Sequence, residues 1–299
     1  MIRSCGQRRI SHLCPEDFRR NPKGYMCCLY AANAGRIMHY HNPRDINECL
    51  IRLNIDRYMS GNANNLLRGG ADKFAVQKMV ADLGFPDILI EQYGAYDSFD
   101  EIPFDTLPNQ FVLKMNNASG RNYICTDKSA MDKGALKKLF DEWMADRHYG
   151  FAEGEWHYEL IEPKIVVEKY LSNLGESSLI DYKFHCFRGH VHSCLVCYDR
   201  VGHSVNYDHY DINWNPTYGT HDWACKGRRL ITKPKNYDKM LEIASKLSAE
   251  HEHVRVDLYE VDDKILFGEL TFTPSANMML YYKQEMLDEL GREYKKWNG

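Results

Sequence analysis

Two acidic residues near the C-terminal end, Asp257 and Glu269, have the spacing of a pair that faces across a β-hairpin. Each lies in an apolar run, and the Asp-Asp pair between the runs is typical of a turn. With a three-residue loop, Arg255 would also lie opposite Thr271, and because alternate residues share a face, all four side chains would project together. Facing carboxylates repel unless a cation lies between them, and such oxygen ligands suit Mg²⁺. A solvated hairpin face explains the same charges about equally well.

Three lysines could add positive charge to such a site. Lys114 ends an apolar run and enters the loop 116–122, which offers donors to a phosphate. Lys73 follows an aspartate near an expected helix start, and Lys183 points away from the two aromatic residues beside it on an expected strand. No P-loop motif occurs in the chain. Taken singly, these positions also fit a hairpin turn, a helix start and a strand.

Hydropathy patterns predict the elements that would position these residues. Helices are expected near 46–58, 71–80, 133–147 and 237–250, followed by a helical C-terminal tail. Strands are expected at 87–91, 111–114, 123–126, 164–171, 180–187, 191–198, 254–261 and 264–272. The pattern predicts a polar loop at 92–100 and a long loop at 199–232, which could cover a site.

Composition excludes several classes of protein. The chain has 299 residues, enough for about two domains or one large one, and its 44% hydrophobic and 27% charged residues exclude a disordered or low-complexity chain. A net charge of -4 without a long basic block argues against nucleic acid or anionic lipid as a partner. No apolar run approaches the ~18 residues of a membrane span, and residues 1–20 lack a signal-peptide core, so we expect a cytoplasmic protein.

The cysteines are expected to be reduced. Ten cysteines in a long chain without a secretion signal do not suggest a disulfide framework. Cys194 and Cys197 form a C-x-x-C pair inside an apolar strand, and no second pair completes a zinc site. We therefore expect both to be buried as small apolar side chains.

Seven segments follow one another in order over about residues 60–280. They are Ala-Asp-Lys-Phe-Ala-Val (71–76), Tyr-Asp-Ser-Phe-Asp-Glu-Ile (96–102), Leu-Pro-Asn-Gln-Phe-Val-Leu-Lys (107–114), Val-Val-Glu-Lys-Tyr-Leu (166–171), Asp-Tyr-Lys-Phe-His-Cys-Phe (181–187), Arg-Val-Asp-Leu-Tyr (255–259) and Gly-Glu-Leu-Thr-Phe-Thr-Pro (268–274). Taken together, these segments resemble the ATP-grasp superfamily, and most closely its TupA-like branch, which is associated with teichuronopeptide, capsule and other surface-polysaccharide biosynthesis. Any one of them could arise by chance, whereas the ordered set is much more specific.

The resemblance implies an α+β class ATP-grasp fold, in which two α+β subdomains clasp a nucleotide. It divides the chain into a helical or irregular region 1–60, a short pre-ATP-grasp region 61–105 and an ATP-grasp domain 106–299. Within that domain the A subdomain would cover about 106–163 and the B subdomain about 164–280, followed by the helical tail. The oligomeric state stays open.

The resemblance also implies ATP and Mg²⁺ as cofactors and suggests roles for the lysines. It places Lys73 near the α-phosphate and Lys114 on the strand before the phosphate loop, with Ser119 and Gly120 in that loop. Lys183 would lie near the phosphates or the reacting acyl group.

The remaining expected site residues concern the adenine and the metal. The adenine would bind a hinge in which Glu168 takes the exocyclic amine; the hinge residues are Glu168, Lys169, Tyr170 and Leu171. Asp257 and Glu269 match the metal-binding acids, and Arg255 is a candidate clamp on a phosphate or intermediate. Thr271 stands where the broad superfamily has Asn, and its hydroxyl is a weaker magnesium ligand, so the occupancy of a second metal site is left open.

The implied reaction is an ADP-forming ligation. A carboxylate is phosphorylated to an acyl phosphate, and an amine then attacks it to give an amide. The substrates would be a small-molecule or glycan carboxylate and an amine, with a uronic acid of a capsule or exopolysaccharide precursor as the leading candidate. A kinase acting on a hydroxyl and a non-catalytic nucleotide- or glycan-binding module are the alternatives.

Aromatic and histidine residues of the long loop 199–232 could contact a sugar. A purely structural loop is an equally good interpretation. The residues are His203, Tyr207, His209, Tyr210, Trp214, His221 and Trp223.

Overall fold

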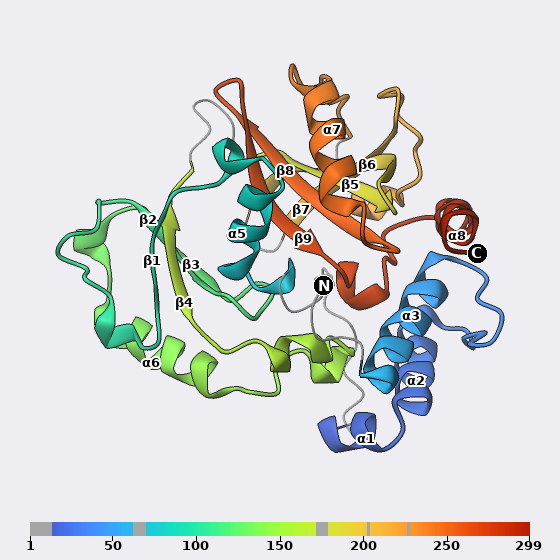
Figure 1. The fold of residues 1–299 in the computed structure, drawn as a ribbon, viewed down its shortest axis with the longest axis horizontal. Helices are drawn as coiled ribbons and strands as arrows, with labels where there is room; N and C mark the ends of the chain where they lie inside the picture. The colour runs from blue at the N-terminus through green and yellow to red at the C-terminus, as the bar shows by residue number, and fades with distance from the viewer. Residues whose placement is uncertain (1–13, 62–69, 172–178, 202–203, 226–227) are drawn as a thin grey trace.

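The computed structural model describes residues 14–61, 70–171, 179–201, 204–225 and 228–299, and it contains two antiparallel sheets (Figure 1). The first sheet has the strand order β1-β4-β2-β3, with β1 (Gln92–Tyr96), β2 (Phe111–Met115), β3 (Asn122–Cys125) and β4 (Ile165–Lys169). The second has the order β7-β6-β5-β8-β9, with β5 (Asp181–Phe187), β6 (His190–Val201), β7 (Ser204–Asp211), β8 (Val254–Val261) and β9 (Lys264–Thr271). The combination of helices with these sheets confirms the predicted mixed α and β class.

Helices surround the sheets. The α-helices are α1 (Pro15–Arg20), α2 (Pro22–Ala34), α3 (Ile46–Ser60), α5 (Ala75–Asp82), α6 (Lys133–Ala145), α7 (Tyr237–Ser248) and α8 (Gln284–Asn298). Short 3-10 helices are η2 (Pro86–Ile88), η3 (Phe99–Glu101), η4 (Lys128–Ala130), η5 (Phe151–Glu153), η6 (Trp156–Leu160), η7 (Asp222–Ala224) and η8 (Pro274–Asn277).

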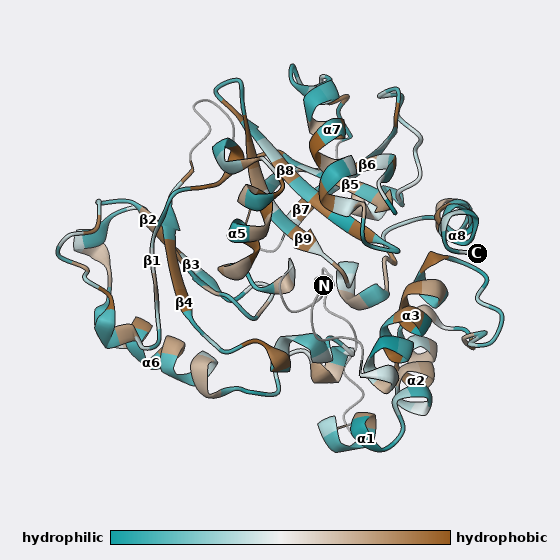
Figure 2. Ribbon diagram, viewed as in Figure 1, coloured by the Kyte–Doolittle hydropathy of each residue, from teal (hydrophilic) through white to brown (hydrophobic). Residues whose placement is uncertain are grey.

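Each sheet has its own apolar core. Helix α6 buries Leu136 and Phe140 in a cluster with the inner strands of the first sheet, as their helical spacing predicts. Helix α7 buries Met240 and Ile243 against the second sheet, in a larger cluster that extends to the N-terminal helices. Figure 2 shows apolar residues along strands of both sheets, whereas the helices carry a mixture of hydrophilic and apolar residues. Because each sheet packs around its own apolar cluster, the two sheets are rigid supports for the residues that lie between them.

The N-terminal helices hold an irregular segment, residues 146–160, that follows α6. In α3, Asn54 donates a hydrogen bond to the carbonyl oxygen of Gly154 at 2.7 Å, and Tyr58 packs edge-on against Trp156. Gly154 has φ +79°, and a Cβ at this position would lie 2.4 Å from the Sδ of Met26. Glycine is thus required here by both backbone conformation and space.

Most of the predicted elements are confirmed, and the errors fall in residues 71–100 and 199–232. The helices predicted near 46–58, 133–147 and 237–250 correspond to α3, α6 and α7, while the helix predicted at 71–80 begins only at Ala75, as α5. The prediction of a strand at 87–91 is wrong, since Pro86 opens a 3-10 turn there, and the predicted loop at 92–100 contains β1. The predicted loop at 199–232 contains β7. Both missed strands lie at sheet edges, and neither contains a run of aliphatic residues, although Asp208 and His209 of β7 are buried.

The β8–β9 hairpin pairs the predicted residues, but its turn is shorter than the predicted three residues. Asp257 pairs with Glu269, and Arg255 with Thr271. The turn, however, has two residues, Asp262 and Asp263, both with positive φ, as a type I′ turn requires. An irregularity after Asp257 shifts the register and restores the predicted pairing.

Two smaller expectations concern the cysteines and membranes. Cys194 and Cys197 are buried and unoxidised, as predicted. Among the helices within the described ranges, none is both long and apolar enough to span a bilayer. The predicted region boundaries after residues 60, 105 and 163 remain predictions. One sheet contains strands from both sides of the last two of these boundaries, because β1 and β4 pair with β2 and β3 in it.

Candidate functional site

A cavity of about 800 Å³ lies where the second sheet meets the irregular segment 146–160 and the loop after β2. The β-sheet contributes Lys183, Arg255, Glu269 and Thr271 to its lining, and Lys73 enters from the N-terminal side of α5. A cavity of this size matches those that hold small-molecule ligands. The structure thus brings six of the predicted site residues into one cavity, these five and Ser119 of the loop after β2.

The register of the second sheet explains why three of the charged residues meet. Lys183 on β5 pairs with Asp257 on β8, which pairs in turn with Glu269 on β9. Residues directly opposite one another in neighbouring strands project from the same face. The three side chains therefore form a row across the sheet.

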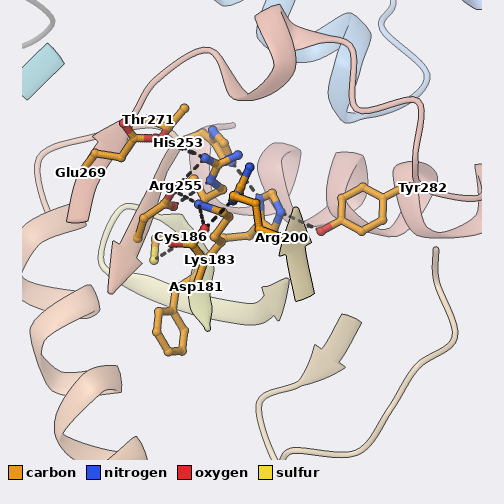
Figure 3. A network of polar contacts seen from close by, with 12 residues as sticks. Asp181, Lys183, Cys186, Arg200, His253, Arg255, Glu269, Thr271 and Tyr282 are labelled. Carbon is orange, nitrogen blue, oxygen red and sulfur yellow. Dashed lines mark hydrogen bonds and ion pairs between the residues drawn. The ribbon is translucent and has the colours of Figure 1, made fainter. Parts of the chain in front are cut away.

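Arg255 and Lys183, which lie close together in Figure 3, both donate hydrogen bonds to the carboxylate of Asp257. Arg255 donates from Nε to Oδ1 at 2.7 Å and from Nη2 to Oδ2 at 2.8 Å, and Lys183 donates from Nζ to Oδ2 at 2.5 Å. Asp257 is only 1% exposed and does not line the cavity. Although burial works to lower the pKa of Lys183, the nearby carboxylates of Asp181 and Asp257 raise it above its ordinary value. Lys183 therefore carries its charge at neutral pH.

Glu269 faces the cavity more openly than Asp257. Its side chain is 41% exposed, and its Oε1 accepts a hydrogen bond from the Thr271 hydroxyl at 3.0 Å. Burial works to raise the pKa of Glu269, but the charges of Lys73, Lys183 and Arg255 outweigh it and lower the pKa to about 2. Glu269 is therefore an ionised oxygen donor throughout the physiological pH range.

Lys73 reaches the cavity from the opposite side. Its Nζ donates to the carbonyl oxygen of Ala118 at 2.5 Å, and its backbone nitrogen donates to Asn116. Burial lowers its pKa, and the charge of Lys114 acts in the same direction, while Glu269 opposes both. Lys73 thus joins α5 to the loop after β2.

The loop after β2 is tied down by a tyrosine. Ser119 lines the cavity, whereas Gly120 is exposed next to it with φ +73°. The hydroxyl of Tyr149 donates to the Ser119 carbonyl oxygen at 2.5 Å and accepts from the Ser119 backbone nitrogen at 3.1 Å. Arg121 lies over the Tyr149 ring, 4.3 Å from its centroid. The expected phosphate loop therefore rests on the segment 146–160.

The expected adenine hinge lies outside the lining of this cavity. Glu168 is 8% exposed on β4 and forms an ion pair with Lys114 on β2. Lys169 ends β4, and its backbone nitrogen donates to Glu91 at 2.9 Å. Tyr170 and Leu171 follow, half-buried, at the end of this described range. The roles predicted for Lys114, Gly120 and the four hinge residues remain predictions.

The donor set of the cavity fits a nucleoside triphosphate and one magnesium ion. Lys73, Lys183 and Arg255 supply the positive charge that phosphates need. Glu269 and Thr271 offer oxygen atoms from one face, whereas Asp257 is closed off by its two cations. Among the described residues, no group of three or more His, Cys, Asp or Glu side chains is placed to hold a metal ion. Mg²⁺ typically takes one or two protein carboxylates together with water and phosphate oxygens.

Sequence reasoning missed several residues that line the cavity. The most notable is Glu155, whose Oε1 accepts a hydrogen bond from the Thr273 hydroxyl at 2.6 Å. Thr273 follows Glu269 and Thr271 at every second position along the chain. This spacing was the one available sign in the sequence that its side chain would face the same cavity. Other missed lining residues are Arg121, His148, Tyr149, Glu153, Tyr158, Arg200 and Tyr281.

Of the seven aromatic and histidine residues expected in the long loop, Tyr207 lines the cavity. Its ring stacks on that of Tyr281 with centroids 4.9 Å apart. His209 and Tyr210 are buried and Trp214 stacks on Tyr210, so these residues have structural roles. His221 and Trp223 stack on each other away from the cavity lining. His203 lies outside the described residues.

The family model described as TupA-like ATPgrasp matches residues 54–295. This chain belongs to that family and is therefore an ATP-grasp protein, as the ordered motifs predicted. Among curated proteins, no sequence matches this chain significantly.

Solved structures of low sequence identity are similar in part. The ATP-grasp ligase PsnB with its minimal precursor has 10% identity and a TM-score of 0.47, with 94% of this chain and 74% of that chain covered. D-cycloserine synthetase DcsG has 12% identity and a TM-score of 0.44, with 84% and 80% covered. A D-alanine–D-alanine ligase from Helicobacter pylori has 11% identity and a TM-score of 0.41, with 76% and 57% covered. This chain thus spans little more than half the length of that last ligase.

Proposed function

We propose that this protein is an ATP-dependent, ADP-forming ligase that joins a carboxylate to an amine through an acyl phosphate. The observation that carries the proposal is the convergence of Lys73, Lys183 and Arg255 around the ionised Glu269 in one cavity. Phosphoryl transfer needs positive charge fixed around the moving group and little covalent chemistry from the protein. The chain supplies that arrangement from three separate elements.

Each residue has a distinct part in this proposal. Lys73 and Lys183 bind phosphate oxygens, and Arg255 orients the phosphoryl group or the acyl intermediate. Glu269 and the Thr271 hydroxyl hold magnesium, which neutralises phosphate charge when bound. Asp257 fixes Arg255 and Lys183 and joins the metal ligands only if one of these cations turns to a phosphate.

The proposed acid is a uronic acid of a capsule or exopolysaccharide precursor. The stacked rings of Tyr207 and Tyr281 give the cavity an aromatic surface, and Arg200 adds a charge beside it. An aromatic surface with polar groups at its edge suits a sugar ring. We also propose that the protein works in the cytoplasm, where ATP is available.

Phosphorus NMR of the protein with MgATP tests this function directly. We expect ADP and free phosphate to form only when both an acid and an amine are present, in a panel of uronic acids and amino acids. A phosphate ester on the acceptor would instead identify a kinase. Binding of MgATP without turnover on any acceptor would identify a binding module.

A matched variant pair locates the activity in this cavity. Glu269→Gln should abolish turnover, because it removes the charged oxygen ligand without changing the shape of the side chain. Glu285→Gln, on the first turn of α8 and outside the cavity lining, should retain wild-type turnover. Equal turnover in both variants would refute the site.

A further inference from the structure

Glu155 is a carboxyl group in the cavity that the reaction described above does not use. It lies between η5 and η6, and its backbone nitrogen donates to Gly150 at 2.7 Å. A Cβ on Gly150 would lie 2.8 Å from the carbonyl oxygen of Glu155, so the backbones of these two residues are in close contact. The neighbouring Gly154 is held by Asn54 of α3. The backbone of Glu155 is therefore fixed from two sides.

One oxygen of Glu155 is engaged and the other is available. Oε1 accepts from the Thr273 hydroxyl at 2.6 Å. Within the described residues, no donor contacts Oε2. A carboxylate held in position at one oxygen, with the second oxygen open to a substrate cavity, has the geometry of a group that exchanges protons with a ligand.

We propose that Glu155 accepts the proton of the nucleophile that attacks the acyl phosphate. This inference rests on the proposed ligase function and adds the group that activates its second substrate. Glu155 and Glu269 approach the same cavity from different walls, the first from the segment 146–160 and the second from β9. The two carboxylates would thus serve the nucleophile and the phosphate respectively.

The proton transfer precedes the attack of the nucleophile on the acyl phosphate. An ammonium group cannot attack, so its nitrogen first loses one proton to Oε2 of Glu155. The freed lone pair forms the C–N bond, and the bond between the acyl carbon and the phosphate oxygen breaks with its electron pair leaving on that oxygen. The surplus proton on nitrogen then passes to the departing phosphate, and Glu155 returns its proton to water.

The surroundings of Glu155 favour this role. Burial raises its pKa to about 7, against the lowering effects of the Thr273 hydrogen bond and the Lys73 charge. A base with a pKa near the working pH is the most effective proton acceptor. The titratable or charged groups that face Glu155 are Glu153, Tyr149 and Tyr158 from its own segment, Lys73 from the start of α5 and Glu269 from β9.

The first test compares two nucleophiles in Glu155→Gln, which keeps the shape of the side chain. Hydroxylamine is already neutral at pH 7 and traps an acyl phosphate as a hydroxamate without help from a base. With D-glucuronate, D-galacturonate and the amino-acid panel, we expect the variant to lose amide formation about 100-fold or more while hydroxamate formation stays within about threefold of wild type.

Three results would overturn parts of this assignment in distinguishable ways. Amide formation within threefold of wild type in Glu155→Gln overturns the role of Glu155. An equal loss with both nucleophiles also overturns it, since the side chain would then act in binding or in phosphorylation. Wild-type protein that forms neither product overturns the ligase itself, and this is measured before any variant is made.

The second test shifts the pH profile in opposite directions. Thr273→Val removes a hydrogen bond that stabilises the carboxylate, so the acid limb of amide formation should move up by about one pH unit. Glu153→Gln removes a negative charge that raises the pKa of Glu155, so the limb should move down by about half a unit. If the acid side of the pH–rate profile stays in place in both variants, or moves in the same direction in both, the assignment of Glu155 is overturned.

Discussion

The two walls of the cavity carry carboxylates that differ in their partners. On the wall formed by β8, Asp257 receives three hydrogen bonds from Arg255 and Lys183 and has no access to the cavity. On the wall formed by the segment 146–160, Glu155 receives one hydrogen bond from a neutral hydroxyl. The same functional group is therefore neutralised on one wall and left available on the other.

The two carboxylates therefore have different roles: Asp257 keeps neighbouring cations charged and oriented, whereas Glu155 can exchange protons. Asp257 balances two buried cations, so that they remain charged and oriented for a phosphate. Glu155 lacks a strong partner, and its proton equilibrium is accordingly sensitive to its neighbours. Replacing each carboxylate in turn should thus give different kinds of defect.

Asp257→Ala should give the largest effect on stability. It leaves Arg255 and Lys183 buried without their shared counter-charge, which typically costs about 3–5 kcal/mol of unfolding free energy. Urea denaturation measures the loss. Glu269→Ala is the control on the neighbouring strand, and because its side chain is 41% exposed we expect a change of about 1 kcal/mol or less. Similar losses in the two variants would contradict the comparison.

The sequence was informative wherever periodicity fixed the geometry. Alternation along β8 and β9 was sufficient to predict that Arg255, Glu269 and Thr271 share a face, and the structure places all three in the cavity lining. The pairing of Asp257 with Glu269 was also predictable, although the predicted loop length was wrong. What alternation could not show is that Asp257 would be enclosed by two cations.

Glu155 could not be predicted, because nothing periodic surrounds it. It lies between 3-10 turns in a segment without regular hydropathy, and its partner Thr273 is 118 residues away in the chain. The strands β1 and β7 were missed because neither contains a run of aliphatic residues, and the buried polar residues of β7, Asp208 and His209, are of types that are usually exposed. Contacts that arise only when distant irregular segments meet leave no signal in a single sequence.

The second prediction concerns the pH dependence of stability. The pKa of Glu155 rises from 4.5 to about 7 on folding, so the folded protein binds the proton more tightly than the unfolded chain between these values. Its contribution to stability is therefore present below pH 4.5 and is lost as pH rises to about 7, by up to ~1.4 kcal/mol per pH unit. Urea denaturation between pH 5 and pH 7 should show this slope in wild type but not in Glu155→Gln. If stability changes with pH in the same way in wild type and in Glu155→Gln, the raised pKa of Glu155 is contradicted.

The third prediction addresses the lysine that joins α5 to the phosphate loop. Lys73→Met should weaken the binding of ATP about 10- to 100-fold, since a hydrogen bond to a charged group contributes about 1.5–3 kcal/mol. Isothermal titration calorimetry measures this change. Lys78→Met, within α5 itself, removes an exposed lysine that pairs with Asp82, and it should bind ATP as wild type does. Equal affinities of the two variants would argue against a role for Lys73 in phosphate binding.

The smallest effect is expected at the contact between Tyr149 of the segment 146–160 and Ser119 of the loop after β2. Tyr149→Phe removes the hydroxyl that bonds both backbone groups of Ser119, at a cost of about 1 kcal/mol. Amide hydrogen exchange in residues 118–120 should accelerate about fivefold, because the loop loses its attachment to the segment 146–160. Tyr123→Phe on β3 is the control, since its hydroxyl has no hydrogen-bond partner in the part of the chain that the structure describes. If both variants leave the exchange unchanged, the loop is held by Lys73 and Arg121 instead of by Tyr149.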